Sequence, residues 1–464
     1  MSQELYQSFY QHADHYREQS LQNRRFKYND IIPLIQELKQ YPEFSVSAKG
    51  TSVQGRDIFL IRYGSGPRKV FLWSQMHGDE PTATAAIFDI FNFLKDTASN
   101  KVVRELFQKE LTLYIMPMVN PDGAELYQRR NIRNIDLNRD ARKLANPEAR
   151  ILMKTFEEIK PHFGFNLHDQ STLYTVGEKN SSAAISFLAP SVDRKQSIPP
   201  HRADAMRLIG YLTQALQPFM PGHIGKYTDE FEPRAFGDIF QSKGTSTILV
   251  ESGGWKNDSE KQFIRKMNYV LLLAACNSIA LGNYQAIPDS VYHQIPFNDR
   301  YLYDLMLRNI TFFDGKDTLT TDIGIVYTEK TVSALQNGYG ILGTIADVGD
   351  LSTFYGYTDI DLTDCFLDFG RVFTLKKEEQ LPDPVTFYSE GYSAIYPEDP
   401  GTYATLHPFP FLFVKSQDFV LDAKPNRNAT FLVRRNGKYI YAVVNGQLID
   451  LKIKKSMVRN GAGI

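Results

Sequence analysis

The chain has 464 residues, which exceeds the usual size of one domain, so two or more domains are expected. Hydrophobic residues make up 42% of the sequence and charged residues 23%, a balance that excludes a disordered or membrane-embedded protein. Because the net charge is −1 and no basic run is present, we expect no nucleic-acid partner and no attraction to anionic membranes.

The termini of the chain and its cysteines give no sign of export. Residues 1–6 contain no basic segment followed by an apolar one, as a secretory signal would. The most apolar stretch, residues 269–280, is roughly a dozen residues long and too short to span a bilayer. Cys276 and Cys365 form no CxxC pair and indicate no disulfide framework. The sequence therefore predicts a cytoplasmic protein without a membrane segment.

Residues 1–284 alternate between strand-like and helix-like patterns and are expected to form one domain. The short apolar runs that predict strands are residues 68–76, 111–118, 163–167 and 245–250. The stretches with helical spacing are residues 87–94, 148–159, 203–216 and 261–279. This alternation predicts an α/β domain with a mixed, largely parallel central sheet and helices on both faces.

Residues 285–464 have a different character. Helical periodicity ends, and short strand-like pieces alternate with Gly, Asn, Asp and Pro turns. Those pieces include residues 309–313, 323–328, 430–434 and 438–444. The pattern predicts a second, β-rich and sandwich-like domain, for which the sequence indicates no role. Its three neighbouring aspartates, at positions 361, 364 and 368, are typical of turn carboxylates rather than of a cation site.

The four apolar runs of the first domain share one property. Each run ends at or just before a polar residue capable of chemistry: His77, Asn120, His168 and Glu251. In open α/β sheets, ligands bind outside the carboxyl ends of the strands. We therefore expect a functional site at that edge of the sheet.

Two of these strand ends carry residues that bind metals. His77 and Glu80 lie three residues apart on one turn, and His168 ends another strand. Imidazole nitrogens and carboxylate oxygens are ordinary zinc ligands, and a catalytic zinc site uses three protein ligands and keeps one position open. Each of these residues alone would also fit an ordinary turn or a structural histidine. His162 is a weaker candidate because it precedes its strand.

An ordered set of motifs narrows the interpretation. Asn-Pro-Asp-Gly at residues 120–123 is followed by Arg-Arg-Asn at 129–131 and Asp-Leu-Asn-Arg at 136–139. With the His-x-x-Glu turn upstream, the strand-end histidine downstream and Leu-Val-Glu-Ser-Gly at 249–253, the set resembles the zinc metallocarboxypeptidase family, the carboxypeptidase A-like enzymes. The resemblance covers roughly residues 45–280 and implies a carboxypeptidase-like fold for the first domain.

The resemblance implies a role for each motif residue. The implied ligands of one zinc ion per chain are His77, Glu80 and His168. Glu251 would be the general base and acid, Arg129 would stabilise the oxyanion, and Asp136 would orient the first histidine. The residues implied in substrate binding are Asn138 and Arg139, as a carboxylate clamp, and Tyr227, which is assigned on chain order alone.

Three functions remain open from the sequence. The first is a metallocarboxypeptidase that removes a C-terminal residue from a peptide. The second uses the same chemistry on an N-acyl amino acid or a cell-wall peptide, as some relatives do, and needs the same carboxylate clamp. The third is a non-catalytic zinc-containing binding protein, which would have no use for Glu251 or Arg129. The sequence gives no oligomeric state.

The substrate is expected to be a peptide or acyl-amino acid with a free carboxylate. Its specificity pocket should be formed by the segment between Tyr227 and Glu251. Within that segment, Arg234 and Asp238 could meet a charged substrate side chain or could pair with each other, and the sequence does not decide between these alternatives.

Overall fold

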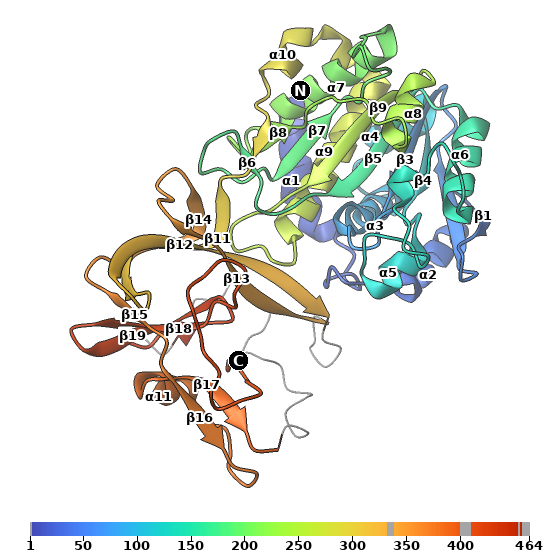
Figure 1. Ribbon diagram of the computed structural model, residues 1–464. Coiled ribbons are helices and arrows are strands. Elements are labelled where there is room, and N and C mark those ends of the chain that lie inside the picture. The colour runs from blue at the N-terminus through green and yellow to red at the C-terminus, as the bar shows by residue number, and fades with distance from the viewer. Residues whose placement is uncertain (1, 332–337, 400–409, 453–454, 457–464) are drawn as a thin grey trace. The chain divides into compact units, whose positions relative to one another are not determined.

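The computed structural model describes residues 2–331, 338–399, 410–452 and 455–456 (Figure 1). The chain divides into two compact units. The first comprises Met1–Trp255 and Glu260–Arg300, and the second comprises Lys256–Ser259 and Tyr301–Ile464. Each unit has its own hydrophobic core, and each is described separately below.

The first unit is built on an eight-stranded mixed sheet (Figure 1). In order across the sheet, its strands are β1 (Phe44–Thr51), β2 (Asp57–Tyr63), β4 (Leu111–Met116), β3 (Arg68–Ser74), β5 (Phe163–Asp169), β9 (Ser246–Ser252), β7 (Ile185–Leu188) and β8 (Ile224–Lys226). The central strands β4, β3, β5 and β9 are parallel, whereas β1, β2 and β7 pair antiparallel with their inner neighbours. The predicted mixed, largely parallel sheet is confirmed.

Helices cover both faces of this sheet (Figure 1). They are α1 (Ser2–Tyr16), α2 (Tyr28–Glu37), α3 (Thr82–Lys95), α4 (Lys101–Glu110), α5 (Pro121–Leu126), α6 (Pro147–Ile159), α7 (Pro200–Leu216), α8 (Phe236–Ser242), α9 (Gln262–Leu281) and α10 (Asp289–Gln294). Short 3-10 turns are η1 (Leu38–Gln40), η2 (Leu137–Arg139) and η3 (Asn283–Ala286).

The central part of strand β3, residues 70–73, is apolar because it is buried on both faces of the sheet. Successive side chains of a strand point to opposite faces, so a strand that is buried on both sides needs apolar residues at every position. Val70 and Leu72 enter the core that contains α3, α7 and α9, whereas Phe71 and Trp73 enter the core that contains α6 and α8. The same alternation in β5 and β9 turns their chemically active residues toward the α8 side.

The first unit extends past residue 284, where the sequence predicted the boundary. Helix α10 packs against α7, and strand β10 (Asn298–Asp299) pairs with β6 (Thr175–Val176). Both elements lie in the predicted second domain but fold onto the first unit. These long-range contacts leave no trace in local periodicity, so the sequence pattern could not place this boundary.

The second unit is rich in β-strands, as predicted. Its described strands are β11 (Leu302–Phe313), β12 (Thr318–Thr331), β13 (Tyr339–Gly349), β14 (Tyr355–Asp361), β15 (Phe366–Asp368), β16 (Arg371–Leu375), β17 (Tyr392–Pro397), β18 (Phe431–Arg435), β19 (Lys438–Val444), β20 (Gln447–Asp450) and β21 (Lys455–Ser456). Most of them form one nine-stranded sheet, while β16 and β17 form a separate parallel pair beside α11 (Pro384–Ser389). Two of the aspartates singled out earlier accept hydrogen bonds from protein groups: Asp361 from Thr363 and Asn309, and Asp368 from Gly370 and Tyr439.

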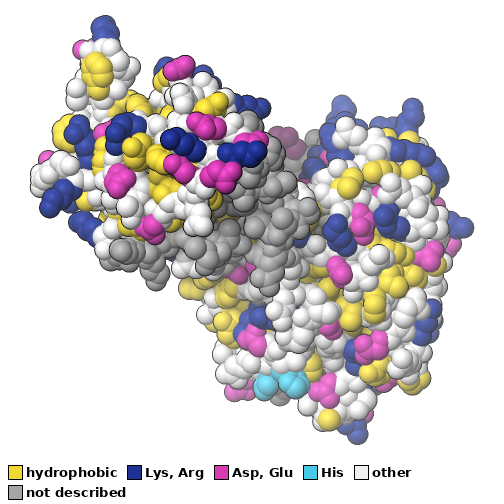
Figure 2. Space-filling model, turned by 90° about the horizontal axis from the view of Figure 1, so that it is seen from below, with side chains coloured by type: hydrophobic (Ala, Val, Ile, Leu, Met, Phe, Trp, Pro, Cys, Tyr) yellow, Lys and Arg dark blue, Asp and Glu magenta, His cyan; other side chains and the backbone are white. Residues whose placement is uncertain are grey.

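The charged side chains on the surface and the hydropathy of the helices both agree with the amino-acid composition. On the face shown in Figure 2, basic and acidic side chains are distributed over both units. Among the residues that the structure describes, no helix combines the length and the hydropathy needed to cross a bilayer.

Candidate metal centre

The first two candidate ligands lie on a tight turn between β3 and α3. The Glu80 N–H donates to the carbonyl oxygen of His77 at 3.2 Å and closes the turn. At Gly78, a Cβ atom would lie 2.0 Å from the backbone carbonyl carbon of Gly123, so only glycine permits this approach. The turn thus packs backbone to backbone against α5, whose N-cap is Asn120, with Oδ1 accepting from the Gly123 N–H. Of the four strand-end residues, Asn120 is the one that does not line the cavity, and it stabilises the ligand turn instead.

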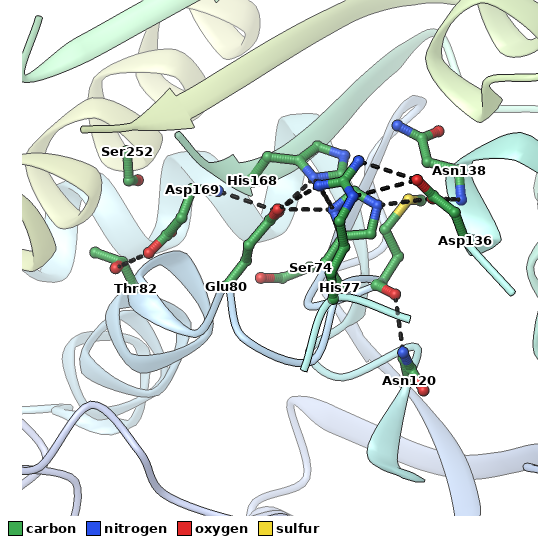
Figure 3. Close-up of polar contacts among 12 residues, drawn as sticks. Ser74, His77, Glu80, Thr82, Asn120, Asp136, Asn138, His168, Asp169 and Ser252 are labelled. Carbon is green, nitrogen blue, oxygen red and sulfur yellow. Dashed lines mark hydrogen bonds and ion pairs between the residues drawn. The ribbon is translucent and has the colours of Figure 1, made fainter. Parts of the chain in front are cut away.

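The three predicted ligands converge (Figure 3). His77 Nδ1 lies 2.8 Å from Glu80 Oε1, and His168 Nδ1 lies 2.6 Å from Glu80 Oε2. The two Nδ1 atoms are 3.2 Å apart, and all three side chains are buried. Within the described part of the chain, this is the one group of histidine, cysteine and carboxylate side chains that could share a metal ion.

This arrangement fits zinc. Zinc–imidazole bonds are about 2.0–2.1 Å long, so two nitrogens on one tetrahedral ion lie about 3.3 Å apart. The 3.2 Å between the Nδ1 atoms of His77 and His168 agrees with that spacing. Two imidazoles and one carboxylate form a donor set that catalytic zinc sites use, and they leave a coordination position open.

The electrostatics of the cluster favour positive charge between the ligand atoms. Burial by itself lowers the pKa of His77, but the carboxylates of Glu80 and Asp136 outweigh it and raise that pKa to about 9. Burial raises the pKa of Glu80, yet the two histidines hold it well below its usual value. For His168, burial dominates and lowers the pKa. A cation on the Nδ1 atoms would replace the protons that these carboxylates attract.

Asp136 and Arg129 complete the surroundings of the first histidine (Figure 3 labels Asp136). His77 Nε2 lies 3.0 Å from Asp136 Oδ1, so its N–H can donate there and leave Nδ1 free for a metal. The half-exposed Arg129 guanidinium lies 3.1 Å from Glu80 Oε1 and 3.1 Å from Asp136 Oδ2. It therefore lies beside the ligand atoms.

Glu251 lies next to the third histidine because of strand register. His168 on β5 is paired with Glu251 on the adjacent parallel strand β9, and both side chains point to the same face. Glu251 is buried deeply enough that its pKa is raised well above the usual value, with the Glu80 carboxylate adding to the rise. Its Oε2 has no hydrogen-bond partner among the described residues, so this oxygen is available for a substrate or a water.

The remaining predicted residues line one cavity with the ligands. The cavity has a volume of about 370 Å³ and is lined by His77, Glu80, Arg129, Asn138, Arg139, His168, Tyr227 and Glu251, together with residues that the sequence analysis did not single out. Asn138 Oδ1 accepts from the Phe236 N–H at 3.0 Å, and Arg139 Nη1 donates to the Asn138 carbonyl oxygen at 2.8 Å. The Tyr227 hydroxyl donates to Gln170 Oε1 at 2.8 Å.

Arg234 and Asp238 do not pair with each other, whereas contact of Asp238 with a substrate side chain stays a prediction. Arg234 pairs with Glu232 at 2.6 Å, not with Asp238. Asp238 lines the cavity and accepts the Glu232 N–H at 3.0 Å. His162 lies at the opposite end of β5, roughly 20 Å of strand away from the ligands, and its Nδ1 accepts the Lys69 N–H. It is thus not part of the centre.

Several residues of the cavity were missed from sequence. Asn166, Gln170, Tyr174, Gly237 and Arg300 all line it. Asn166 could have been found, because it lies two positions before His168 and a strand places such residues on the same face. The others come from loops and helix ends whose positions depend on packing.

Comparison with known proteins finds similarity over part of the first unit. A family described as "Zinc carboxypeptidase" matches residues 31–148, which contain the His77–Glu80 turn and the motifs from Arg129 to Arg139. Residues 31–148 of the first unit therefore match a zinc carboxypeptidase domain. The matched segment stops before His168 and Glu251, which the strand register adds to the site of this carboxypeptidase domain.

Individual relatives are distant and longer. "Probable carboxypeptidase 2" of Arthroderma benhamiae is 27% identical over 157 residues, covering 34% of this chain and 28% of that protein. "Carboxypeptidase E" of Caenorhabditis elegans is 28% identical over 153 residues, covering 28% of this chain and 32% of that protein. The chain thus matches less than a third of the length of these relatives. Among solved structures, a metallo-carboxypeptidase from Burkholderia cenocepacia shares 16% identity with a TM-score of 0.45, covering 56% of this chain and 70% of that one.

The contact between Asp136 and His77 gives a first prediction. Asp136→Asn should weaken zinc binding or lower activity by about 10- to 100-fold, because the amide no longer fixes the tautomer and orientation of the histidine. Zinc affinity would be measured by competition with a chromogenic chelator. Asp238→Asn is the matched control. Asp238 also lines the cavity, but it accepts a hydrogen bond from the Glu232 N–H, whereas Asp136 contacts His77. The zinc affinity of the Asp238→Asn variant should therefore match that of the wild type. Equal affinities for the two variants would contradict the assignment.

Proposed function

We propose that the carboxypeptidase domain hydrolyses the amide bond that precedes a free C-terminal carboxylate, using one zinc ion held by His77, Glu80 and His168. The observation that carries this proposal is the convergence of the three ligand atoms beside the unpaired carboxylate of Glu251. A purely structural zinc site would be closed by a fourth protein ligand and would not need a cavity or an adjacent free carboxylate.

Zinc at these ligands would polarise the scissile carbonyl and lower the pKa of a bound water. Glu251 would take the proton of that water and pass it to the departing amine. Its burial and the neighbouring Glu80 charge raise its pKa, which makes Glu251 a stronger acceptor for the proton of that water. The Arg129 guanidinium would bind the developing oxyanion, an interaction that strengthens in the transition state.

Arg139 and Asn138 would hold the terminal carboxylate of the substrate. A guanidinium recognises a carboxylate with two parallel hydrogen bonds, which lysine does not provide. Arg139 Nε now lies 3.6 Å from Glu232 Oε2, which shows that a carboxylate can reach it. Asn138 is fixed through its Oδ1 to the α8 N-terminus, so its remaining amide group can face the cavity.

A matched pair of substrates tests the clamp. We expect a peptide with a free C-terminus to be cleaved on the order of 100-fold more efficiently, in kcat/KM, than the same peptide with a C-terminal amide, because the amide carries no charge to pair with the arginine. Arg139→Ala should raise KM for the free peptide and remove the discrimination. Indifference to amidation would refute the clamp.

Activity on peptides and on N-acyl amino acids also tests the two alternative functions, a deacylase and a non-catalytic binding protein. An N-acyl amino acid shares the free carboxylate, so a deacylase would prefer N-acyl amino acids over peptides of the same terminal residue. A zinc-loaded protein that cleaves neither class would support the non-catalytic alternative. The cytoplasmic location stays a prediction, and both cysteines are free and buried.

A further inference from the structure

Beyond the metal ligands, the cavity rests on a second row of side chains. His168 on β5 and Glu251 on β9 are neighbours in register. Two residues earlier on each strand, and therefore on the same face, Asn166 is paired with Leu249. Leu249 is paired in turn with Leu188 on β7. The side chains of Asn166, Leu249 and Leu188 all line the cavity. We call these three residues, together with Gly237 and Pro190, the cavity floor.

Asn166 is the polar group of this floor. Its side chain is 2% exposed, and its Oδ1 has no hydrogen-bond partner among the described residues. A buried polar atom without a partner costs about 1–3 kcal/mol, and a ligand or a water that bonds to it removes this cost.

Gly237 keeps the floor open. A Cβ atom there would lie 3.3 Å from Asn166 Nδ2 and 3.5 Å from Pro190 Cγ. Any larger side chain at this position would therefore cover the amide.

The floor is adjacent in structure to both the clamp and the metal ligands. Asn138 accepts from the Phe236 N–H, and Phe236 is followed by Gly237, which stands over Asn166. Asn166 is in turn two residues from His168 on the same strand face, about 7 Å away. A substrate whose carboxylate meets Arg139 and whose carbonyl meets the metal ligands would direct its terminal side chain toward this floor.

We propose that the cavity floor selects substrates whose C-terminal residue carries an uncharged carboxamide, asparagine or glutamine. This inference rests on the proposed function. A primary amide offers one donor group and one acceptor, so it pairs with the Asn166 amide whichever way that amide is turned. Leu249 and Leu188 pack against the methylene groups that precede the carboxamide.

Charged side chains fit the floor less well. Asp238 lines the same cavity, and its carboxylate would repel a terminal aspartate or glutamate. A lysine ammonium would lose its hydration against Leu188, Leu249 and Pro190.

The test uses the zinc-loaded full chain and a series of acylated dipeptides that differ only in the last residue: Gln, Asn, Leu, Lys, Glu or Ala. We expect kcat/KM for Gln or Asn to exceed that for Leu by about 10-fold or more, since a site that hydrogen-bonds a substrate group rejects analogues that lack it. Asn166→Leu should reverse the ratio of Gln to Leu while zinc stoichiometry stays at the wild-type value. Gly237→Ala should slow the Gln substrate more than the Ala substrate, because its Cβ approaches the Asn166 amide.

Calorimetry with free glutamine, asparagine, leucine and lysine tests the floor without turnover. Tighter binding of the two carboxamides, lost in Asn166→Leu, would support the inference. A preference for lysine or glutamate, or a Gln-to-Leu ratio that Asn166→Leu does not change, would overturn it. If peptides are cleaved but the preference is independent of Asn166, the inference alone fails. If no substrate is cleaved and no amino acid is preferred, both the proposed function and the inference fail.

Discussion

Glu251→Gln should abolish turnover while leaving zinc bound at the wild-type stoichiometry. Glutamine has nearly the same shape but cannot accept the proton of the attacking water, so kcat should fall by about 10²- to 10⁴-fold. The metal ligands are untouched because Glu251 is a strand neighbour of His168 and not a member of the ligand cluster. Activity on a free-carboxylate peptide and metal content of the same sample would be measured together.

A matched control separates this effect from a general loss of structure. Glu157→Gln changes an exposed glutamate on α6, far from the cavity lining, and should keep full activity. A Glu251→Gln protein that retains activity within a few-fold of the wild type would exclude this residue as the base. A variant that loses zinc as well as activity would show that Glu251 supports the ligand geometry.

His168→Ala should prevent stoichiometric zinc binding. It removes one of three ligands and leaves the buried Glu80 carboxylate without its 2.6 Å partner. Zinc stabilises the folded chain by RT ln(1 + [Zn]/Kd), about 4 kcal/mol at a thousandfold excess over Kd. The wild-type protein should therefore show a clear rise in Tm when zinc is added, and the variant should show little or none. Differential scanning calorimetry with and without chelator would measure this difference.

His162→Ala provides the control for that experiment. His162 precedes the same strand, but it contacts Lys69 at the far end of β5. Its zinc-dependent rise in Tm should equal that of the wild type. If the two histidine variants respond to zinc alike, the ion is bound elsewhere and the proposed centre is wrong.

The sequence predicts the parts of the site that local spacing determines. His77 and Glu80 share one turn, and His168 and Glu251 end apolar runs, so a parallel sheet brings them together without further information. Tyr227 could be assigned only by chain order, because its hydroxyl is positioned by a hydrogen bond to Gln170 on another loop. The roles of these residues stay predictions until the variants are measured.

Other features depend on contacts between distant segments. Lys261 on the N-terminal side of α9 pairs with Asp169 at 3.0 Å, and the Asp169 N–H approaches Glu80 at 3.2 Å. Neither the lysine nor the aspartate belongs to a motif, so the sequence analysis could not connect them. Asn166 was missed although its spacing from His168 places both on one strand face, because an asparagine within an apolar run is usually structural. In the structure its Oδ1 has no hydrogen-bond partner among the described residues.

Because of the register between β5 and β9, catalytic activity depends on correct pairing of these two strands. If β9 slipped by one residue along β5, Val250 would stand beside His168 and Glu251 would enter the apolar interior that contains α7 and α9. Such a slip would remove the base from the metal ligands and bury an unpaired carboxylate in one step. A misregistered chain would therefore be unstable as well as inactive, so a stable population that binds zinc but lacks the base in place is not expected to accumulate.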